Sequence, residues 1–558
     1  MVKGREKTTR EARIEYLLVI VLSGLVFLLI CSIIVLASVP PVSQDALVHH
    51  LAVPKLYLKH AAIYEIPFMV FSYYPMNLDL LYLIALYLGN DIIAKFIHFS
   101  FALLTAWLIF DYLKRRINVT YALLGLVFFL SIPIIVKLSI TAYVDLGLVF
   151  FSTASLLLLL KWFESNFHLK FLVFSAIFCG LAMGTKYNGL TTFFILTLFV
   201  PFIYSRYNQK VAPGFFRSAG YGILFLFIAL LFFSPWLIKN YFWTSNPIFP
   251  LYDQWFNPQN VIDRQTLGIF TYRSLLYHET WWQIALLPVR IFFQGQDGNP
   301  QYFDGRLNPF LLLLPFFAFY RIGRDPEVVR NEKKIILIFG VLFFAFGFFS
   351  STLRIRYISP IIPPLVILSI FGIEKLVLTV SKGYSGNIKG MALAIIFLLV
   401  CFSLCMNGGY IVNKFRHVAP FSYLKGVLTR DEYIERYRLE YPVMRYTNGN
   451  LPHDARILLI YLGNRGYYCD REYVFDMIHN KSSLRQLVKR SREPKEVLLG
   501  LKEMGITHLL INYDIFDRWV KTNFSNKDQK LLGEFLRKHL KPLYSKWGYG
   551  VSQLENCD

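Results

Sequence analysis

Long apolar runs separated by short polar segments fill the first three quarters of the chain. A helix needs about 20 mostly apolar residues to cross the hydrocarbon core of a membrane, and some runs here reach that length only when extended. We expect a polytopic α-helical membrane domain over residues 1–406 with eleven spans. The predicted spans are 14–38, 93–112, 120–139, 146–160, 171–185, 189–205, 219–238, 308–320, 335–351, 358–379 and 391–406.

The apolar run 74–88 is interrupted by Pro75, Asn77 and Asp79. Because an ionisable group is costly inside hydrocarbon, we expect this run to be an interfacial or re-entrant helix. The first run is too long for the apolar part of a signal peptide, and two prolines follow it where a cleavage site would need small residues. It is therefore predicted to be an uncleaved first span.

Basic residues gather on one side of the predicted spans. Short loops rich in Lys and Arg face the cytoplasm, so we expect a multi-pass protein of the cytoplasmic membrane with a cytoplasmic N-terminus. The segments 39–92 and 239–307 and the C-terminal region then lie outside. The residues that mark the cytoplasmic side are Lys3, Arg5, Lys7, Arg10, Arg13, Lys114, Arg115, Arg116, Lys161, Lys170, Arg206, Lys210, Arg217, Arg321, Arg324, Arg330, Lys333, Lys334, Lys382 and Lys389.

Residues 407–558 have a different character. They hold 25 Lys and Arg and 17 Asp and Glu, whereas the 406 residues before them hold only 33 and 19. The segments 456–461 and 507–512 are predicted to be buried strands, and Pro494 is suited to the first turn of a helix. We expect a small extracytoplasmic α/β domain, and it lacks a glycine-rich loop that would bind a phosphate.

Composition excludes a soluble enzyme. Of the 558 residues 55% are hydrophobic and 17% charged, against about 25% charged in soluble proteins, and the mean hydropathy is +0.45. The net charge of +22 lies largely in loops, with no separate basic stripe, so nucleic acid is not an expected partner. The six cysteines lack zinc-site spacing, and a disulfide between Cys469 and Cys557 stays open.

Polar residues near the outer ends of predicted spans are the candidates for chemistry. Asp45 follows the first span and is a candidate general base; its alternatives are a solvated residue or a helix N-cap. His50 either hydrogen-bonds near Asp45 or packs. Asp145 either lines an acceptor site or caps the fourth span.

Three cations also lie at the predicted outer face, against the usual distribution. Lys186 sits between Gly184 and Gly189, a spacing that suits a tight turn with close backbone approach. Its alternative is a snorkelling lysine. Arg354 and Arg356 present planar forks that suit phosphate oxygens, or they anchor to lipid headgroups. Together with a base, such cations could stabilise a phosphate leaving group during transfer to a hydroxyl.

The chain resembles the GT-C superfamily of polytopic glycosyltransferases, in the branch of the protein O-mannosyltransferases and the lipid A aminoarabinose transferases. Each motif is weak alone, but their order and spacing match this group. The motifs are the Asp45 loop, Tyr143-Val144-Asp145, Gly184-Thr185-Lys186, Ser234-Pro235-Trp236, Asn246-Pro247-Ile248-Phe249-Pro250, and Arg356-Tyr357 followed by Pro360 and Pro363-Pro364.

The resemblance implies an inverting transferase that moves a sugar from a polyprenyl-phosphate donor to an extracytoplasmic lipid, glycan or protein. It implies Asp45 as the catalytic base, with Lys186, Arg354 and Arg356 at the donor phosphate, and Asp145, His50 and Tyr357 as acceptor or supporting residues. No cofactor is required, although related oligosaccharyltransferases use a divalent metal.

Two departures from the family pattern concern the acceptor. Many members have an adjacent acidic pair in the first loop, whereas Ala46 follows Asp45 here, and Tyr74-Pro75-Met76-Asn77 replaces the usual Pro-Pro-Leu. A transporter or lipid-linked sugar flippase is the main alternative, although no matched halves with broken helices are visible. A non-catalytic scaffold on the same fold is a third.

Overall fold

The computed structural model describes residues 9–208, 214–258, 268–349, 352–476 and 482–555. It forms two compact units. The membrane unit comprises residues 1–38, 74–81 and 93–420, and the sheet unit comprises 39–73, 82–92 and 421–558.

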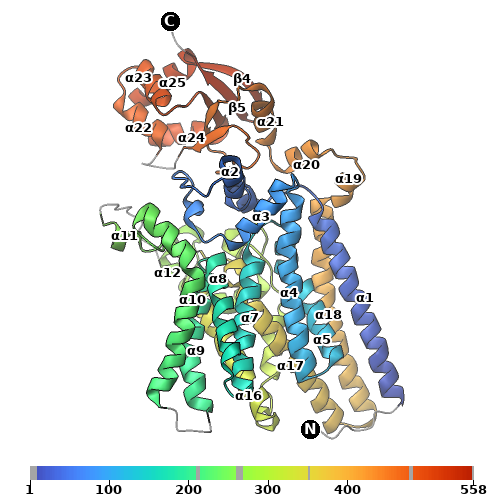
Figure 1. Cartoon of the computed structure of the whole chain (residues 1–558). Coiled ribbons are helices and arrows are strands. Elements are labelled where there is room, and N and C mark those ends of the chain that lie inside the picture. The colour runs from blue at the N-terminus through green and yellow to red at the C-terminus, as the bar shows by residue number, and fades with distance from the viewer. Residues whose placement is uncertain (1–8, 209–213, 259–267, 350–351, 477–481, 556–558) are drawn as a thin grey trace. The chain divides into compact units, whose positions relative to one another are not determined.

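Long apolar helices build the membrane unit (Figure 1). The chain is a multi-pass membrane protein. The helices long and apolar enough to span a membrane, among the described residues, number seven, or eight when one bent pair is included. The seven comprise α1 (Thr9–Ala37), α4 (Ile92–Arg116), α7 (Asp145–Glu164), α9 (Gly189–Tyr207), α10 (Phe215–Thr244), α17 (Ile362–Gly383, extended back to Ile355 by a 3-10 turn) and α18 (Gly386–Val418).

The bent pair joins α5 (Val119–Ser131) to α6 (Pro133–Ser139) at an angle of 66°. Pro133 has no N–H for the ladder of α5 and is tolerated as the first residue of a new helix. A backbone N–H that has no helical partner at the start of α6, that of Ile134, donates instead to the carbonyl of Arg306 in a neighbouring segment at 3.1 Å.

Three of the eleven predicted spans correspond to helices that do not meet the length and composition criterion. They are α8 (Leu169–Thr185), which has 17 residues, α15 (Phe310–Phe317), which has eight, and α16 (Glu327–Phe348), whose first half contains five charged residues. The run 74–88 contains α3 (Asn77–Tyr87), whose 11 residues extend only about 16 Å at 1.5 Å per residue, in agreement with a helix that does not span.

Short helices fill the segment between α10 and α15. They are α11 (Asp253–Phe256), α12 (Ile269–Tyr277), α13 (Trp281–Ala285), α14 (Leu287–Phe293) and a 3-10 turn, Pro300–Tyr302. A further 3-10 turn, Ile322–Arg324, follows α15.

The boundary predicted at residue 407 falls inside α18, which continues unbroken to Val418. Gly408 and Gly409 each cost a helix only about 1 kcal/mol, which is too little to end one of 33 residues. The following helix α19 (Pro420–Leu424) leads into the sheet unit.

The sheet unit contains a mixed five-stranded sheet in the order β2-β1-β3-β5-β4. Strands β2 (Glu472–Phe475), β1 (Arg456–Ile460) and β3 (His508–Asn512) are parallel, and β5 (Tyr549–Leu554) joins β3 and β4 (Leu540–Lys546) antiparallel. All five residues of β3 are buried. The strands predicted at 456–461 and 507–512 are confirmed as β1 and β3. The helix predicted from Pro494 is also confirmed, as α23 (Pro494–Glu503).

Helices α22 (Ser483–Arg490), α23 and α25 (Asn526–Lys538) contribute apolar residues to one core with β1 and β3, which includes Leu458, Leu509 and Phe535. The unit also contains α2 (Ala52–His60), α20 (Arg430–Tyr437), α21 (Tyr441–Asn450), α24 (Tyr513–Asn523), a π-helical turn, Ala46–His50, and a 3-10 turn, Val70–Tyr73. Cys557 lies outside the described residues.

Segment 39–73 belongs to the sheet unit, although it follows the first span in sequence. The N–H of Tyr467 donates to the carbonyl of Leu47 at 3.2 Å. Lys55 Nζ donates to the Tyr467 carbonyl at 2.7 Å and to Asp470 Oδ1 at 2.5 Å. These bonds fix the loop that contains Asp45 to the C-terminal residues of the chain.

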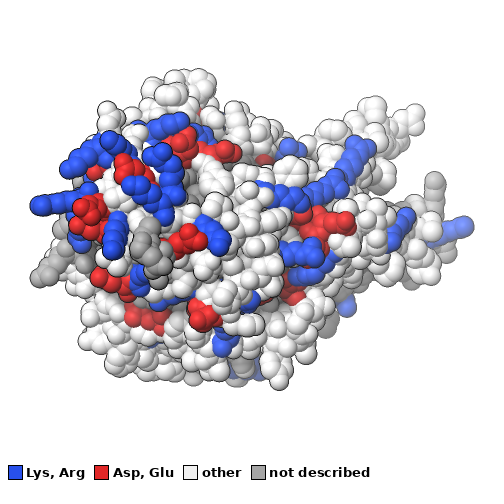
Figure 2. Space-filling model, turned by 90° about the horizontal axis from the view of Figure 1, so that it is seen from above, with Lys and Arg blue, Asp and Glu red and all other residues white. Residues whose placement is uncertain are grey.

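Charges of both signs intermingle on the face shown in Figure 2. Ion pairs of the sheet unit include Lys521 with Asp517 at 2.6 Å and Lys546 with Glu435 at 2.5 Å. Such a mixed surface produces no extended field of one sign.

Candidate functional site

Three of the predicted cations meet around one aromatic ring in the membrane unit. The ring centroid of Tyr357 lies 5.0 Å from Lys186 Nζ, 5.2 Å from the guanidinium of Arg356 and 5.9 Å from that of Arg354. A second ring, that of Tyr143, lies 5.2 Å from Arg356. These are cation–π distances, so the two tyrosines hold the cations near each other despite their mutual repulsion.

Asp145 is the carboxylate of this cluster. Its side chain is fully buried, and its Oδ1 accepts a hydrogen bond from Lys186 Nζ at 2.6 Å. Arg356 is also buried, with 6% of its surface exposed, and acts electrostatically on Asp145. A fully buried carboxylate cannot line an open acceptor site, so its position favours the supporting role among the alternatives for Asp145.

The turn between α8 and α9 places Lys186. The N–H of Lys186 still donates to Ala182 at 3.2 Å, and the N–H of Gly189 donates back to the carbonyl of Lys186 at 2.8 Å. A Cβ on Gly189 would lie 2.4 Å from the Ala182 carbonyl, and one on Gly184 would lie 2.2 Å from the Asn77 amide. The predicted tight turn with close backbone approach is confirmed at Gly189, where a Cβ would meet backbone atoms, whereas at Gly184 it would meet the side chain of Asn77.

Arg354, Arg356 and Tyr357 come from the 3-10 turn Ile355–Ile361 that precedes α17, with Arg354 as its N-cap residue. A 3-10 turn repeats every three residues. Arg354, Arg356 and Tyr357 therefore point in different directions around the turn, except that Arg354 and Tyr357, three apart, share one side. The carbonyl of Tyr357 accepts from Asn188 Nδ2 at 3.3 Å, which ties this turn to the α8–α9 turn.

Motifs from distant parts of the sequence meet beside Lys186. Tyr187 Oη donates to the carbonyl of Phe249 at 2.7 Å and accepts from Asn240 Nδ2 at 3.1 Å. Asn77 Oδ1 accepts from Trp236 Nε1 at 2.8 Å. The weak motifs 234–236 and 246–250 therefore support one turn together with segment 74–77, which departs from the family pattern.

His98 is a residue that sequence analysis missed. It is fully buried in α4; its Nε2 accepts the N–H of Leu146 at 2.9 Å, and its Nδ1 lies 2.8 Å from the carbonyl of Thr141. Because a backbone N–H can only donate, the ring must be neutral with its hydrogen on Nδ1. His98 thus fixes the start of α7 and with it Asp145. A histidine inside an apolar span was the available signal.

Acidic residues continue the charge network beyond Arg354. Arg354 lies 3.6 Å from Asp304, which also pairs with Lys137 at 2.8 Å. Asp297 pairs with Lys414 at 2.6 Å and lies 3.5 Å from Lys137. Desolvation raises the pKa of Asp297, but the two lysines outweigh it and hold the pKa below its ordinary value.

Two lysines and two aspartates balance in that outer part of the network. Around Tyr357 three cations gather, Lys186, Arg354 and Arg356, with Asp145 hydrogen-bonded to Lys186 and Asp304 3.6 Å from Arg354. A phosphate monoester carries up to two negative charges near neutral pH, and arginine forks match its oxygens.

Asp45 and His50 belong to the sheet unit. Asp45 is half-buried and immediately precedes the π-helical turn Ala46–His50, and its side chain makes no cap hydrogen bond to that turn. His49 and His50 are buried, with ring centroids 3.9 Å apart, and His49 stacks on Phe71 at 4.4 Å. π-Helical turns are frequent at functional sites.

No group of three or more His, Cys, Asp or Glu side chains that could hold a metal occurs within the described ranges.

The model of the dolichyl-phosphate-mannose-protein mannosyltransferase family matches residues 78–238. No curated protein sequence matches the chain. The solved structure of ArnT from Cupriavidus metallidurans bound to undecaprenyl phosphate is 13% identical, with a TM-score of 0.55 over 96% of this chain and 97% of ArnT.

The archaeal oligosaccharyltransferase AglB from Archaeoglobus fulgidus, in complex with an inhibitory peptide and a dolichol-phosphate, is 10% identical. Its TM-score is 0.53 over 95% of this chain and 74% of AglB. At these identities the similarity establishes a shared fold.

Proposed function

Because this chain has the polytopic fold of the GT-C glycosyltransferases, we infer that it transfers a sugar from a polyprenyl-phosphate donor to an extracytoplasmic acceptor. The observation that carries this inference is the cluster of three cations, Lys186, Arg354 and Arg356, around the ring of Tyr357 in the membrane unit. The flippase alternative has no comparable observation in its favour.

The two arginines and Lys186 hold the donor phosphate. During transfer the bond between the anomeric carbon and the phosphate oxygen breaks, and its electron pair stays on that oxygen. Cations fixed in advance stabilise this developing charge without reorganising, which is usually the largest catalytic contribution. Asp145 serves as a positioning residue, since its carboxylate fixes the ammonium of Lys186.

Asp45 accepts the proton of the acceptor hydroxyl while the acceptor oxygen attacks the anomeric carbon from the face opposite the phosphate. The products are the glycosylated acceptor with inverted configuration, polyprenyl phosphate and a protonated Asp45 that returns its proton to water. His50 supports this loop. The half-buried position of Asp45 at a π-helical turn supports the assignment, because such turns recur at functional sites.

The distribution of basic residues supports a cytoplasmic N-terminus. In Figure 1 the start of α1, the end of α9, the start of α10 and the connection between α17 and α18 lie at the same end of the membrane unit. That end is rich in Lys and Arg, as cytoplasmic loops are. The reaction then takes place on the outer side of the cytoplasmic membrane.

A transfer assay tests the function. Purified protein receives a radiolabelled polyprenyl-phosphate sugar and candidate lipid, glycan and peptide acceptors. We expect Asp45→Asn to lower kcat by a factor of about 10²–10⁴, the usual contribution of a general base. Asp454→Asn is the matched control, since Asp454 is an exposed aspartate of the same unit. Full activity of Asp45→Asn would remove the base role.

Arg356→Gln tests the donor site separately. We expect a larger rise in KM for the donor than for the acceptor and a fall in kcat of about 10²-fold, as when one donor to a developing anion is removed. The exposed Arg324 supplies the control variant Arg324→Gln. The opposite pattern, with acceptor KM affected more, would place the phosphate elsewhere.

A further inference from the structure

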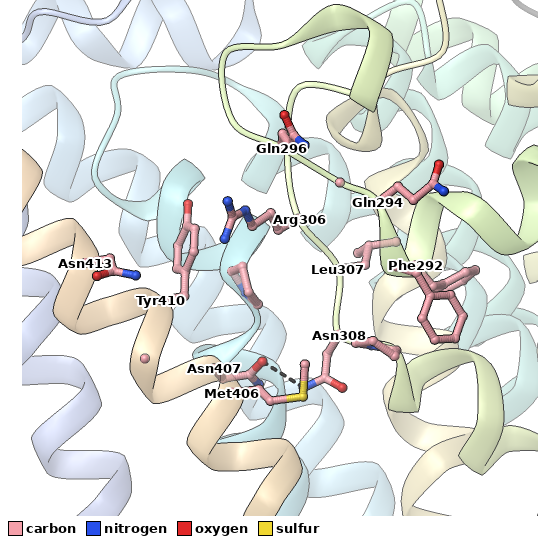
Figure 3. Close-up of a pocket in the computed structure, with 15 residues that line it drawn as sticks. Phe292, Gln294, Gln296, Arg306, Leu307, Asn308, Met406, Asn407, Tyr410 and Asn413 are labelled. Carbon is pink, nitrogen blue, oxygen red and sulfur yellow. Dashed lines mark hydrogen bonds between the residues drawn. The ribbon is translucent and has the colours of Figure 1, made fainter. Parts of the chain in front are cut away.

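A cavity of about 510 Å³ lies in the membrane unit between the loop that precedes α15 and one face of α18. It is separate from the cluster around Tyr357, since none of Lys186, Arg354, Arg356 or Tyr357 lines it. In Figure 3, Arg306 and Tyr410 lie on one side of the cavity, and Gln294 and Phe292 lie on the other.

The floor of the cavity is a closed hydrogen-bond network. Asn308 Nδ2 donates to Asn407 Oδ1 at 2.8 Å (Figure 3). It also donates to the carbonyl of Ser403 at 3.0 Å. Asn407 Nδ2 in turn donates to Ser131 Oγ at 2.9 Å. Because these buried groups hydrogen-bond to one another, they form a fixed base for the cavity. The groups that could bind a ligand are therefore those at the rim.

The rim offers donors without acceptors. Gln294 Oε1 accepts from Arg290 at 2.7 Å, and Gln296 Oε1 accepts from Asn299 at 3.4 Å. The amide NH₂ groups of both glutamines have no hydrogen bond to the residues that the structure describes. The same holds, within that part of the chain, for the exposed guanidinium of Arg306, which also has no carboxylate within ion-pair distance. A group rich in acceptor oxygens would satisfy all three.

Asp297, which is bonded to Tyr410 of the cavity lining, does not supply that group. Asp297 accepts from Tyr410 Oη at 2.6 Å and from Lys414 at 2.6 Å, and it also lies near Lys137. Its charge is therefore already compensated, and the charge of Arg306 remains for a ligand. The ligand that fits is an anion with several oxygens, such as a phosphate ester.

The apolar surface next to the cavity indicates that this anion belongs to a lipid. Met406, Gly409, Tyr410 and Asn413 line the cavity from one stripe of α18. Toward the start of the helix the same stripe continues as Phe402, which packs against Phe310 of α15 with ring centroids 6.2 Å apart.

Large apolar side chains on this stretch are exposed in both helices. They are Ile395, Leu398, Phe402 and Met406 in α18 and Leu313, Phe316 and Phe317 in α15. The polar cavity with its one cation, Arg306, is thus continuous with an apolar surface along one face of α18. This arrangement matches a lipid, in which a charged headgroup is joined to apolar chains.

We propose that this cavity binds the phosphate headgroup of an anionic membrane lipid, with Arg306, Gln294 and Gln296 on the phosphate oxygens. The acyl chains lie along the exposed faces of α15 and α18. Tyr410 connects the site to Arg354 through a hydrogen bond to Asp297 and three successive ion pairs, Asp297–Lys137, Lys137–Asp304 and Asp304–Arg354.

Native mass spectrometry of the purified full chain with dioleoyl phosphatidylglycerol tests the site. We expect Arg306→Gln to raise the Kd for the first bound lipid at least fivefold, whereas Arg324→Gln leaves it within twofold of wild type. Gly409→Phe fills the cavity and has the same effect as Arg306→Gln. Gly408→Phe is its matched control, because both glycines lie in α18 with open space around a Cβ, and Gly408 does not line the cavity.

Equal lipid binding by Arg306→Gln, Gly409→Phe and their controls would overturn the proposal. Dioleoylglycerol, which lacks the phosphate, should bind wild type and Arg306→Gln alike; a dependence of its binding on Arg306 would exclude the phosphate as the recognised group. Binding of inorganic phosphate with no Arg306-dependent lipid binding would reassign the site to a free anion.

The proposal is independent of sugar transfer. Lys186→Met should bind dioleoyl phosphatidylglycerol as wild type does, because Lys186 does not line this cavity. If transfer is absent while the dependence on Arg306 persists, the function fails and the lipid site stands. Loss of lipid binding in Lys186→Met would show that the measured lipid occupies the cluster around Tyr357, which would overturn the separate site.

Discussion

At the scale of single residues, the candidate site depends on compensating charges that are withdrawn from water. The carboxylate of Asp145 is fully buried, and Lys186 is its hydrogen-bonded partner at 2.6 Å. A buried ion pair gains little over an apolar pair of similar size, but removing one partner leaves an uncompensated charge. Because of this asymmetry, removing both partners should restore stability. The contribution of Lys186 to donor binding can then be measured separately from its structural role.

Single and double variants make that separation measurable. Asp145→Asn and Lys186→Met should each lower the free energy of unfolding by about 3 kcal/mol, and the double variant should regain most of that loss. Donor use should stay impaired whenever Lys186 is absent. Thermal unfolding in detergent and donor KM are the two measurements. Restored transfer in the double variant would mean that Lys186 has only a structural role.

At the scale of elements, short turns rather than long helices place the reactive groups. The α8–α9 turn carries Lys186, and the 3-10 turn before α17 carries Arg354, Arg356 and Tyr357. The two turns join through Asn188 and the carbonyl of Tyr357. The helices form the rigid frame of the site. The turns determine where its side chains lie, and helical periodicity does not predict those positions.

Gly189→Ala tests the close approach in the α8–α9 turn. The added Cβ would lie 2.4 Å from the backbone of Ala182, so the turn must open, at a cost of about 1–3 kcal/mol, and donor KM should rise as Lys186 moves. Gly220→Ala is the control, since that helical glycine has no atom within 4 Å of a Cβ. Unchanged stability and KM in Gly189→Ala would contradict this account of the turn.

The loop after α12 contains a buried ion pair with a defined pH dependence. Glu279 is buried and accepts from Arg273 at 2.6 Å and from Arg290 at 3.0 Å. Desolvation raises the pKa of Glu279, but the two arginines together hold it below its ordinary value of 4.5. Because the folded pKa is lowered, this stability is fully present above about pH 4.5 and is lost as the pH falls through the folded value.

Glu279→Gln should therefore lower the melting temperature at pH 7. Breaking a buried ion pair lowers the free energy of unfolding by about 3 kcal/mol. The difference from wild type should stay constant down to about pH 5 and shrink below pH 4.5. Melting curves from pH 7 to pH 3 measure it. A difference that grows on acidification would reverse the assigned sign.

At the scale of the whole molecule, charge is divided by location. Residues 407–558 contain eight more basic than acidic residues, and many of these charges pair on the surface. Most of the remaining excess lies in short connections between membrane helices. Cations inside the membrane unit include those around Tyr357 and Arg306, and those are the groups to which we assign ligands.

Membrane-impermeant maleimide labelling tests the orientation. In a background with all six cysteines replaced by serine, Lys425→Cys should react in intact cells, whereas Lys114→Cys should react only after permeabilisation. Both lysines are exposed, so lack of access can be assigned to the membrane. The reverse labelling pattern would invert the topology and place transfer on the other side.

The sequence by itself determined that this is a membrane protein, and it determined the positions of the apolar segments. It also determined the strands at 456–461 and 507–512 and the helix that begins at Pro494. Those properties follow from local hydrophobicity and turn chemistry, which act over a few to about 20 residues. It also identified Lys186, Arg354, Arg356 and Asp145 as exceptions to the charge pattern.

Only the tertiary structure decided which of these exceptions meet. It brought Lys186, Asp145, Arg356 and Tyr357 together across more than 200 residues of sequence, revealed His98 as a support, and assigned segment 39–73 to the sheet unit. Such contacts depend on packing between distant segments, for which the local pattern of apolar and polar residues contains no signal. The pairing of Asp145 with Lys186 and the unpaired charge of Arg306 are consequences of that packing.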